Sequence, residues 1–419
     1  MFQKVKGFRD VFGEEIPYWN FVEEKISYLF NLFGYSEFKL PILEKIDVFD
    51  RGIGGQTDIV EKEMFAFKDR NDEILALRPE GTASLVRAFI ENKLYNPPGL
   101  KKYYYYGPMF RRERPQKGRF RQFTQAGVEV FGSSSPLIDA DVINLLKNFF
   151  EACGVMEYLK LEINSVGCGK CRPSYKEMLV SFLMDKKDNL CEDCKRRLVS
   201  NPLRVLDCKI ETCKEVTVNS PVMLEHLCED CLEHFGLVKK YLTNFNIDFT
   251  VNPKIVRGLD YYVNTAFEMV TDKLGASSAV GAGGRYDGLV KTLGGPDVPG
   301  IGFAVGVDRL VSLKMLSGRI EEKRPDVFGV IFKKEQLESI LPIFDNLRKN
   351  GINVDFDYDI SSIKSQMKKA DRAKVRFCLI FGEAEFEKGH VTIKDMKSSN
   401  QKEIPISEIS KYIECSLEL

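Results

Sequence analysis

The spacing of apolar residues along the first third of the chain predicts its helices and strands. Between residues 16 and 33 apolar side chains recur every three or four positions and the run ends at Gly34, which predicts a helix. The segment 38–42 predicts a short strand, placed at a sheet edge or bend by Pro41. Further strands are predicted at 73–77, 102–106 and 127–131, with helices at 82–94 and 139–152. Because these elements do not follow a regular strand–helix–strand order, they predict an α+β fold with an antiparallel sheet.

The pattern changes at Cys168. From Cys168 to Cys231 the chain is charged and helix-prone, and it contains eight of the eleven cysteines. Strand-like segments then return at 249–251, 266–270 and 279–284. Such a block between two halves of one sheet indicates an insertion. We therefore expect a core at 1–320 that is interrupted by a helical, cysteine-rich domain at 168–235.

A polar stretch separates this core from the rest of the chain. Residues 317–325 end in Pro325 and are typical of a linker. Beyond the linker, strand-like and helix-like segments alternate as βαβαβ up to residue 381. We expect residues 326–419 to form a small α/β domain of their own.

Composition narrows the class of protein. The 419 residues include 61 Lys and Arg against 61 Asp and Glu, a formal net charge of zero. This balance argues against a wholly basic nucleic-acid coat protein and requires any polyanion site to be local. No run approaches the ~18 apolar residues that cross a bilayer, the first residues are too polar for a signal peptide, and the odd number of cysteines suits a reducing compartment. We therefore expect a cytoplasmic protein.

The three histidines also limit the chemistry. His226, His234 and His390 all lie in the second half, which excludes a histidine base or an H-E-x-x-H zinc helix from the first 225 residues. The chain also lacks a G-x-x-x-x-G-K-[ST] phosphate loop. If the protein binds a nucleotide, arginines must hold its phosphates.

The densest positive charge lies between Lys101 and Arg121, where eight basic residues accompany a single acid, Glu113. A charged run is usually a solvated face. Here, however, apolar and aromatic strands flank a basic loop, so a hairpin would hold guanidinium groups over a sheet, where they can form paired hydrogen bonds with phosphate oxygens. Arg111 lies at the strand end, a rigid place from which to hold a phosphate.

Three further segments interrupt apolar strands with polar residues or glycines. Residues 256–262 place a charge pair beside two tyrosines, and residues 281–288 are rich in glycine, which permits close approach of the backbone. Residues 302–310 predict a strand that leads into a helix with Arg309 in its first turn. Each segment alone has an ordinary structural explanation, such as a salt bridge at a strand–helix junction.

Together these segments resemble the class II aminoacyl-tRNA synthetases, and within them the histidyl-tRNA synthetase family, over nearly the whole chain. The three class signatures are matched by residues 35–44, by 106–115 with 120–123, and by 302–310. Segments that resemble those specific to the family are residues 77–82, 257–262 and 283–288. Arg112 departs from the pattern, because many relatives carry histidine at this ATP-facing position.

The resemblance implies a fold and a reaction. The fold is a class II antiparallel-sheet catalytic core with a helical insertion and a C-terminal α/β anticodon-binding domain, assembled as a homodimer through the first signature. ATP, with Mg²⁺ on its β- and γ-phosphates, and L-histidine would give histidyl-adenylate and pyrophosphate. The histidyl group would then pass to the 3′ end of tRNA(His).

The resemblance also assigns residues to roles. Catalytic arginines would be Arg111, Arg257 and Arg309. The histidine pocket would be formed by Glu80, Thr82, Arg111, Gln125, Glu129, Arg257, Tyr261, Tyr262 and Tyr286. ATP would be contacted by Arg111, Glu113, Phe123 and Arg309, and the tRNA acceptor end by Arg114, Gln116 and Arg119. Glu129 and Tyr262 are the candidates for binding the two nitrogens of the substrate's imidazole. The alternative for Tyr261 and Tyr262 is that they are ordinary aromatic core residues.

The cysteine spacing predicts structural zinc. One tetrathiolate set is formed in sequence order by Cys168, Cys171, Cys191 and Cys194, and a second by Cys208, Cys213, Cys228 and Cys231. The two sites can equally share pairs across the block. The alternative is a reduced, metal-free helical insertion.

The sequence leaves three possible classes of function. The first is an active histidine–tRNA ligase. The second is a non-catalytic, histidine-sensing paralogue that serves as a regulatory subunit in histidine biosynthesis, which we expect to lack the arginines and the C-terminal domain. The third, a general nucleic-acid-binding protein, explains the basic loop but none of the family-specific segments. Because Arg111, Arg257, Arg309 and residues 326–419 are all present, the sequence favours the enzyme.

Overall fold

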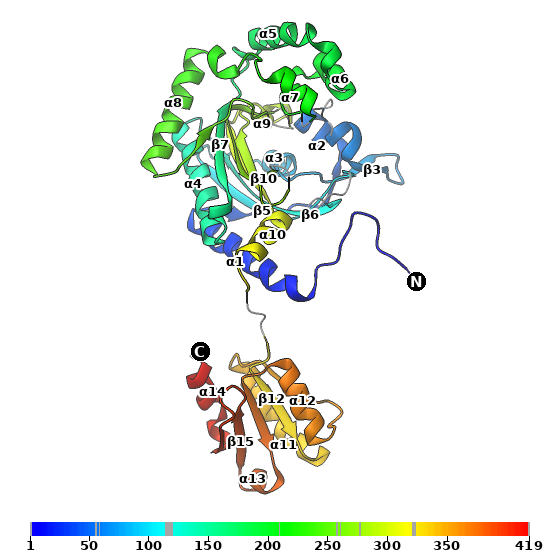
Figure 1. Cartoon of the computed structure of the whole chain (residues 1–419), viewed down its shortest axis with the longest axis vertical. Coiled ribbons are helices and arrows are strands. Elements are labelled where there is room, and N and C mark those ends of the chain that lie inside the picture. Colours follow the sequence, from blue (N-terminus) through cyan, green and yellow to red (C-terminus); the bar gives the residue numbers. More distant parts are fainter. Residues whose placement is uncertain are drawn as a thin grey trace. The chain divides into compact units, whose positions relative to one another are not determined.

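The computed structural model describes residues 2–54, 57, 59–113, 120–208, 210–256, 259, 261–275, 278–320 and 324–417. The chain divides into two compact units, Met1–Ile320 and Glu321–Leu419 (Figure 1). Among the described residues, no helix is both long and apolar enough to cross a membrane.

An eight-stranded sheet organises the N-terminal unit. Its strands, in spatial order, are β1 (Ser36–Glu37), β5 (Lys101–Phe110), β6 (Gln122–Phe131), β11 (Gly300–Gly306), β10 (Ser278–Arg285), β9 (Val263–Thr271), β7 (Lys160–Ser165) and β8 (Thr250–Val251). The two outermost pairs are parallel, and all the pairs between them are antiparallel. The predicted α+β fold with an antiparallel sheet is confirmed.

The two faces of this sheet carry different helices. One face packs its apolar side chains against α1 (Ile16–Leu32), α4 (Pro136–Ala152), α8 (Glu229–Asn244) and α10 (Val307–Ser317). The other face carries α3 (Thr82–Glu91) and α9 (Leu289–Thr292). Because successive residues of a strand point to opposite faces, Val128 and Val130 of β6 join the first core. Glu129 between them is directed to the face with α3.

The predicted strand at 38–42 is wrong. Short strands flank it instead, with β1 before it and β2 (Leu43–Lys45) after it. The buried guanidinium of Arg78 donates to the carbonyls of Leu40 (2.9 Å) and Pro41 (3.3 Å). Pro41 has no N–H to donate to a neighbouring strand. The Arg78 side chain therefore bonds to the carbonyls of this segment, in place of the backbone of a neighbouring strand.

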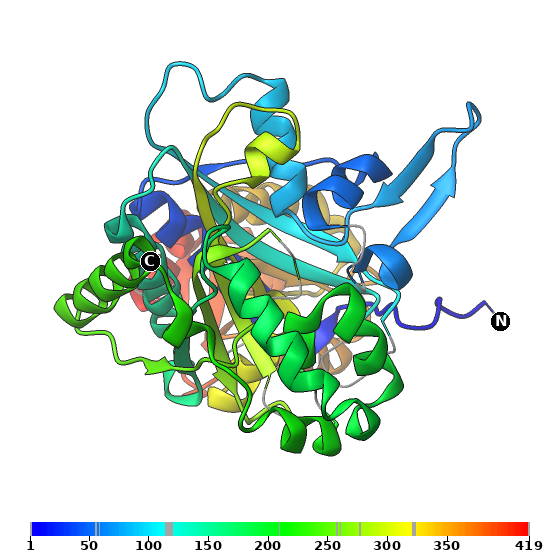
Figure 2. The same ribbon diagram turned by 90° about the horizontal axis from the view of Figure 1, so that it is seen from above.

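A small second sheet stands beside the main one. It consists of β2, β4 (Ile74–Leu77) and β3 (Phe65–Lys68), in that order, and the short helix α2 (Ile46–Phe49) follows β2. The hairpin of β3 and β4 projects from the unit in Figure 2. Exposed apolar side chains gather on these strands and just before them, at Ile42, Leu43, Phe67 and Ile74.

The cysteine-rich block forms a helical layer with its own core. Helices α5 (Arg172–Met184), α6 (Glu192–Ser200) and α7 (Glu211–Thr217) lie together in Figure 1. Tyr175, Leu179 and Leu183 of α5 pack with Leu198 of α6 and with the buried cysteines. The block leaves the sheet after β7 and returns through α8.

A buried ionic network joins α4, α8 and the sheet. Arg285 is fully buried and pairs with Asp139, which also accepts from His234 Nε2 (2.8 Å) and Thr265 Oγ1 (2.6 Å). Burial opposes ionisation of Asp139, but His234 and Arg285 hold its pKa below the usual value. Removing one member of such a pair costs about 3–5 kcal/mol, because the other charge stays buried without its partner. The family-specific arginine at 285 is therefore a structural residue.

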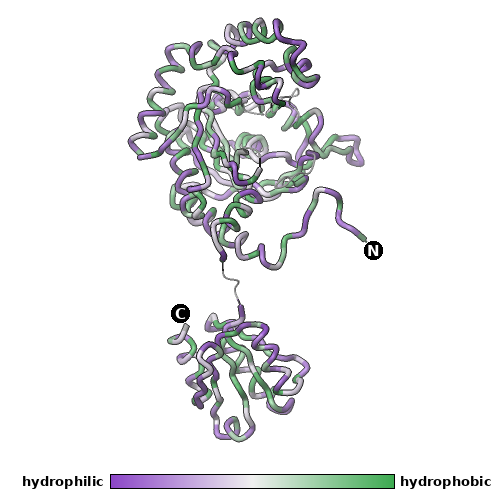
Figure 3. Tube along the Cα trace, viewed as in Figure 1, coloured by the Kyte–Doolittle hydropathy of each residue, from purple (hydrophilic) through white to green (hydrophobic). Residues whose placement is uncertain are grey.

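The C-terminal unit begins with the predicted βαβαβ pattern. Strands β12 (Val327–Ile331), β13 (Val354–Phe356) and β14 (Phe377–Phe381) are parallel and alternate with α11 (Leu337–Lys349) and α12 (Ile363–Ala373). The unit continues through α13 (Glu383–Glu387), an antiparallel hairpin of β15 (His390–Asp395) and β16 (Gln401–Pro405), and α14 (Ile409–Leu417). Hydrophobic stretches run along its central strands in Figure 3. The β15–β16 hairpin was not predicted from the sequence, because its residues are largely polar.

Candidate active site

A pocket of about 280 Å³ opens on the α3 face of the main sheet. Its walls come from the start of α3, the residues that follow β5, the start of β6, parts of β10 and β11, the start of α10 and the segment before β9. The residues predicted for histidine or ATP that line it are Glu80, Thr82, Arg111, Glu113, Phe123, Gln125, Tyr261, Tyr262, Tyr286 and Arg309. Positions far apart in the sequence therefore meet in one cavity.

Glu129 lies beneath this pocket, 1% exposed. Thr82 Oγ1 donates to its Oε1 (2.6 Å), and the Tyr286 hydroxyl donates to its Oε2. Burial raises the pKa of Glu129 to about 8, the charge of Glu80 adds to this effect, and the two hydrogen bonds oppose it. Residue 302, which faces Glu129 across the β6–β11 ladder, must be glycine, because a Cβ there would lie 2.0 Å from Glu129 Oε2.

A second buried carboxylate, Glu80, closes the start of α3. Its oxygens accept the backbone N–H groups of Thr82 (2.6 Å) and Ala83 (2.8 Å). Burial raises the pKa of Glu80 as well. Gln125 Oε1 lies close by in the pocket wall, buried and without a hydrogen-bond partner in the part of the chain that is described. An unsatisfied buried acceptor of this kind suits a ligand that brings N–H donors.

The outer part of the pocket carries the positive charge. Arg111 follows β5, its Nε donates to the carbonyl of Pro79 (2.9 Å), and its guanidinium lies 5.2 Å from the ring centre of Phe123. Glu113 is 3.7 Å from Arg111. Arg309 projects from the first turn of α10 and donates to the carbonyl of Ala279. The predicted strand–helix junction at 302–310 is confirmed.

An aromatic wall closes the inner end. The rings of Tyr261 and Tyr262 are 4.6 Å apart, and Tyr261 meets Tyr286 edge-on at 5.7 Å. Tyr262 and Tyr286 belong to the core beneath α3, but all three rings also line the pocket. They therefore serve as core and as pocket wall at once.

Several predicted residues are not part of this wall. Arg257 lies outside the described residues, as do Arg114, Gln116 and Arg119. Arg112 is described and is not among the pocket residues: its backbone N–H donates to Glu63 (2.7 Å), and its guanidinium lies 6.0 Å from the ring centre of Phe65.

The pocket rim contains residues that sequence reasoning missed. Asp308 lines it, accepts the backbone N–H of Thr124 (2.8 Å), and pairs with Arg9 (3.1 Å). Arg9 stacks on Phe120, another wall residue, at 4.6 Å. Asp308 immediately precedes Arg309, so its position in the third signature was a usable signal. Nothing in the local sequence connects Arg9 with residues 120 and 308.

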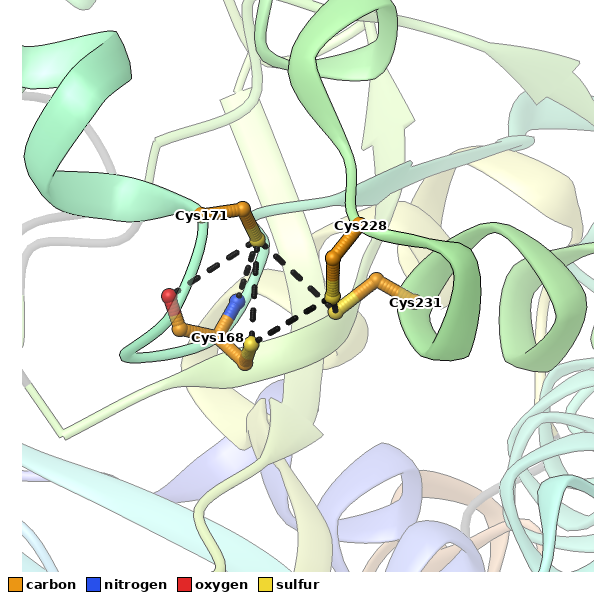
Figure 4. Close-up of side chains that lie close together, drawn as sticks. All are labelled: Cys168, Cys171, Cys228 and Cys231. Carbon is orange, nitrogen blue, oxygen red and sulfur yellow. Dashed lines mark hydrogen bonds between the residues drawn. The ribbon is translucent and has the colours of Figure 1, made fainter.

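The eight cysteines of the insertion form two groups of four. One group is Cys168, Cys171, Cys228 and Cys231, whose side chains face one another in Figure 4, and the other is Cys191, Cys194, Cys208 and Cys213. Within each group all four sulfurs lie within 4.8 Å of one another, and all eight thiols are free. The pairs thus meet across the block, and the grouping in sequence order is wrong. The packing of α5, α6, α7 and α8 determines which pairs meet.

Comparison with known proteins identifies the family. Residues 7–310 match the family model described as histidyl-tRNA synthetase. The chain belongs to the histidyl-tRNA synthetase family. Residues 326–416 match the model described as an anticodon binding domain. The family recognised from the sequence motifs is therefore confirmed, and membership implies the use of ATP with Mg²⁺.

Individual relatives are similar to this chain over almost its full length. The histidine–tRNA ligase of Trichlorobacter lovleyi is 49% identical over 400 residues, covering 96% of this chain and 95% of the relative. That of Geobacter metallireducens is 48% identical over 405 residues, covering 96% and 97%. The apo structure of S. aureus histidyl-tRNA synthetase has a TM-score of 0.83 at 34% identity, covering 99% of this chain and 100% of that one.

The raised pKa of Glu129 predicts a pH-dependent stability. In the folded, ligand-free synthetase Glu129 keeps its proton up to about pH 8, whereas the usual value is 4.5. Between these values unfolding releases a proton, so this group's contribution to stability falls as the pH rises. We expect the melting temperature of Glu129→Gln to fall less than that of the wild type between about pH 5 and pH 8.

The exposed Glu157 provides the control. Glu157→Gln should follow the wild-type curve across the same pH range. Parallel curves for Glu129→Gln and the wild type would show that burial does not hold the proton on Glu129.

Proposed function

We propose that this protein is a histidine–tRNA ligase, which activates L-histidine with ATP and transfers it to the 3′ end of tRNA(His). One observation carries the proposal: a buried carboxylate, Glu129, accepts hydrogen bonds from the pocket residues Thr82 and Tyr286, and the outer part of the same pocket presents Arg111 and Arg309. The inner end suits a side chain with N–H groups. The outer end suits phosphates.

Glu129 and Tyr262 recognise the imidazole in this proposal. A carboxylate accepts about four hydrogen bonds, and Thr82 and Tyr286 account for two at Glu129. Glu129 can therefore accept a further hydrogen bond from an imidazole N–H, and the Tyr262 hydroxyl binds the other imidazole nitrogen. An N–H donor favours the ionised form of Glu129, so histidine binding lowers the pKa of this group. Tyr286 and Tyr261 enclose the ring.

The substrate's α-amino group is assigned to Glu80, Thr82 and Gln125. The unsatisfied Oε1 of Gln125 is the acceptor that a bound ammonium group completes. Glu80 adds negative charge, and its position is held by the N–H groups at the start of α3. Histidine is then oriented by its two ends, with its carboxylate toward Arg111.

Arginines carry the first chemical step. The histidine carboxylate attacks the α-phosphorus of ATP, a P–O bond to the carboxylate forms, and the bond to pyrophosphate breaks. Arg111 binds the α-phosphate and the carboxylate together, Arg257 acts from the opposite side, and Arg309 binds the γ-phosphate. Fixed positive charge stabilises the charge that builds up on the transferring phosphoryl group. Mg²⁺, when bound, neutralises the β- and γ-phosphates.

The stacking at Arg111 prepares this geometry. Phe123 holds one side of the guanidinium, and the Pro79 carbonyl fixes its Nε. The terminal nitrogens are thereby directed to the pocket. Glu113 and the exposed part of the Phe123 ring are assigned to the adenosine.

The second step joins histidine to tRNA. A hydroxyl of the 3′-terminal ribose attacks the carbonyl carbon of histidyl-adenylate, and AMP leaves. Arg114, Gln116 and Arg119 are proposed to hold the acceptor end, and the domain at 326–419, beyond a linker at 317–325, to bind the anticodon. Exposed lysines on and after α12 supply charge for phosphates there: Lys364, Lys368, Lys369 and Lys374.

We also propose a homodimer in the cytoplasm. The exposed apolar side chains Leu43, Phe67 and Ile74 lie on the small sheet, and Leu43 belongs to the first class signature. Exposed apolar surface that clusters in this way marks an interaction site, and a second copy of this chain would cover it. A molecular mass in solution of 47.8 kDa, that of one chain, would contradict the dimer.

The regulatory paralogue is the less favoured alternative. A subunit that only senses histidine needs the inner pocket but not the phosphate-binding arginines or an anticodon-binding domain. Arg111 and Arg309 both line the cavity, and residues 326–416 match an anticodon binding domain. These features support the enzyme.

Histidine-dependent ATP–pyrophosphate exchange tests the assignment. We expect the wild type to catalyse exchange with histidine and not with the other amino acids. Glu129→Ala should lose exchange by at least about 100-fold, because a substrate N–H is left without its buried partner. Its fold, followed by circular dichroism, should be retained, and Glu157→Ala should behave as the wild type. Near-normal exchange by folded Glu129→Ala would disprove the role of Glu129.

We further propose that the two cysteine groups hold structural zinc. A tetrahedral ion with Zn–S bonds of about 2.3 Å places its sulfurs about 3.8 Å apart. The neighbouring sulfurs in the first group are 3.4 to 3.8 Å apart, and those of Cys191 and Cys208 in the second group are 4.0 Å apart. Disulfide sulfurs would be about 2.05 Å apart. The spacing thus fits zinc thiolates.

Metal analysis of the purified protein tests this proposal. We expect about two zinc ions per chain, one for each set of four cysteines. A folded insertion without zinc would reject the proposal. The exchange activity does not enter this measurement, so the two proposals stand or fall separately.

A further inference from the structure

The first cysteine group lies where the insertion joins the catalytic core. Cys168 and Cys171 come between β7 and α5, and Cys228 and Cys231 come at the start of α8, which returns to the sheet. A metal bound by all four would therefore tie together the beginning and the end of the insertion. We call this group the junction site, and we call the group formed by Cys191, Cys194, Cys208 and Cys213 the inner site.

A side chain next to the junction site contacts the backbone of a pocket residue. Arg172 directly follows Cys171 and begins α5. Its Nε donates to the carbonyl of Val166 (2.8 Å), and its Nη2 donates to the carbonyl of Tyr262. One planar guanidinium thus clamps the backbone of a pocket residue to the end of β7. Its position depends on where the Cys168–Cys171 turn is held.

The other half of the junction site touches the same strand. Cys231 Sγ lies 3.1 Å from Oδ1 of the Asn264 side-chain amide, and its S–H donates to that oxygen. A zinc-bound thiolate has no proton to donate and would accept from Nδ2 of the same amide instead. The backbone of Asn264 bonds to the same turn, since its N–H donates to Gly167 (2.9 Å) and its carbonyl accepts from Val166 (2.8 Å). Asn264 adopts a left-handed conformation with φ of 51°, which requires support from its surroundings. Residues 262 and 264 are therefore held from both pairs of the junction site.

The packing at this point leaves little room for adjustment. Gly167 has φ of 66°, and a Cβ there would lie 2.0 Å from Met223 Cε and 2.9 Å from Cys171 Sγ. Because the turn fits closely against the sulfur, a shift of the sulfurs shifts the turn and, through Arg172 and Asn264, the start of β9. Among the described residues, the side-chain hydrogen bonds of the inner site lie within the insertion, such as that from the Cys191 N–H to Cys213 Sγ at 3.2 Å.

We propose that zinc at the junction site positions Tyr262, so that the enzyme's affinity for histidine depends on metal at this site and much less on metal at the inner site. The proposal rests on the histidine-binding and zinc-binding roles proposed above. Arg172 is a positioning residue here, because it acts through the Tyr262 backbone and not on the substrate. ATP binds at the other end of the pocket, so its affinity is not coupled to the junction zinc.

Two matched cysteine variants separate the sites. Cys191 and Cys228 are both half-buried N-cap residues, of α6 and α8, with nearly identical backbone angles of −66° and 161° and of −70° and 163°. Serine is a favourable N-cap, so Cys191→Ser and Cys228→Ser each remove one thiolate with the least disturbance of the helix. Zinc content is measured by mass spectrometry of the metal, and KM for histidine and for ATP by pyrophosphate exchange.

We expect each variant to lose about one zinc ion. Cys228→Ser should raise KM for histidine about tenfold, because this is the loss of affinity expected when a hydrogen-bonded group is no longer held in position. KM for ATP should change less than about twofold. Cys191→Ser should raise KM for histidine several-fold less. An equal effect of the two variants on KM for histidine would overturn the proposal, even with zinc present in the wild type.

Arg172 variants test the link itself with every cysteine in place. Arg172→Leu should keep two zinc ions and raise KM for histidine about tenfold, and Arg172→Lys, which retains one donor, should raise it less. Lys176→Leu, at an exposed position on the same helix, should match the wild type. An unchanged KM for histidine in Arg172→Leu would also overturn the proposal. Absence of zinc from the wild type would instead reject the zinc assignment, and exchange by Glu129→Ala would reject the histidine pocket.

Discussion

The structure of the active site depends on one constraint, the burial of the Glu129 carboxylate in the middle of the main sheet. A buried carboxylate needs hydrogen bonds, and Thr82 from α3 and Tyr286 from the loop after β10 supply them. It also needs space, which Gly302 on the neighbouring strand provides. Helix, loop and strand are thus placed around a single side chain. The same groups that surround Glu129 also line the pocket: Thr82, Tyr286 and Gly302.

Arginines serve two different purposes in this chain. Arg78 and Arg285 are buried and hold backbone carbonyls or Asp139, so they stabilise the fold around the pocket. Arg111 and Arg309 line the cavity, and a hydrogen bond to a backbone carbonyl helps to anchor each of them. The buried arginines keep the strands and turns in place around the second pair, which we propose to bind phosphates. With no histidine in the first 225 residues, the proposed chemistry relies on this fixed charge and not on proton transfer by imidazole.

The insertion is connected to the catalytic core more directly than its position in the sequence suggests. Its first turn and its last helix meet at the junction site, and the same residues contact the strand that begins beside Tyr262. An added domain that shares contacts with a pocket strand can influence substrate binding without touching the substrate. The buried cysteines of the inner site belong to the small helical core of the insertion, as do those of the junction site.

Local periodicity and short motifs were enough to predict the family, the α+β class, many of the helices and strands, and the residue types of the pocket. Which helices, strands and side chains contact one another became known only from the tertiary structure. The junction site joins cysteines 60 positions apart, and helix packing, not local spacing, selects the partners. The 38–42 segment was mispredicted because Arg78, remote in sequence, takes its carbonyls. Arg9 likewise reaches Asp308 across 299 residues, a contact that only the folded sheet creates.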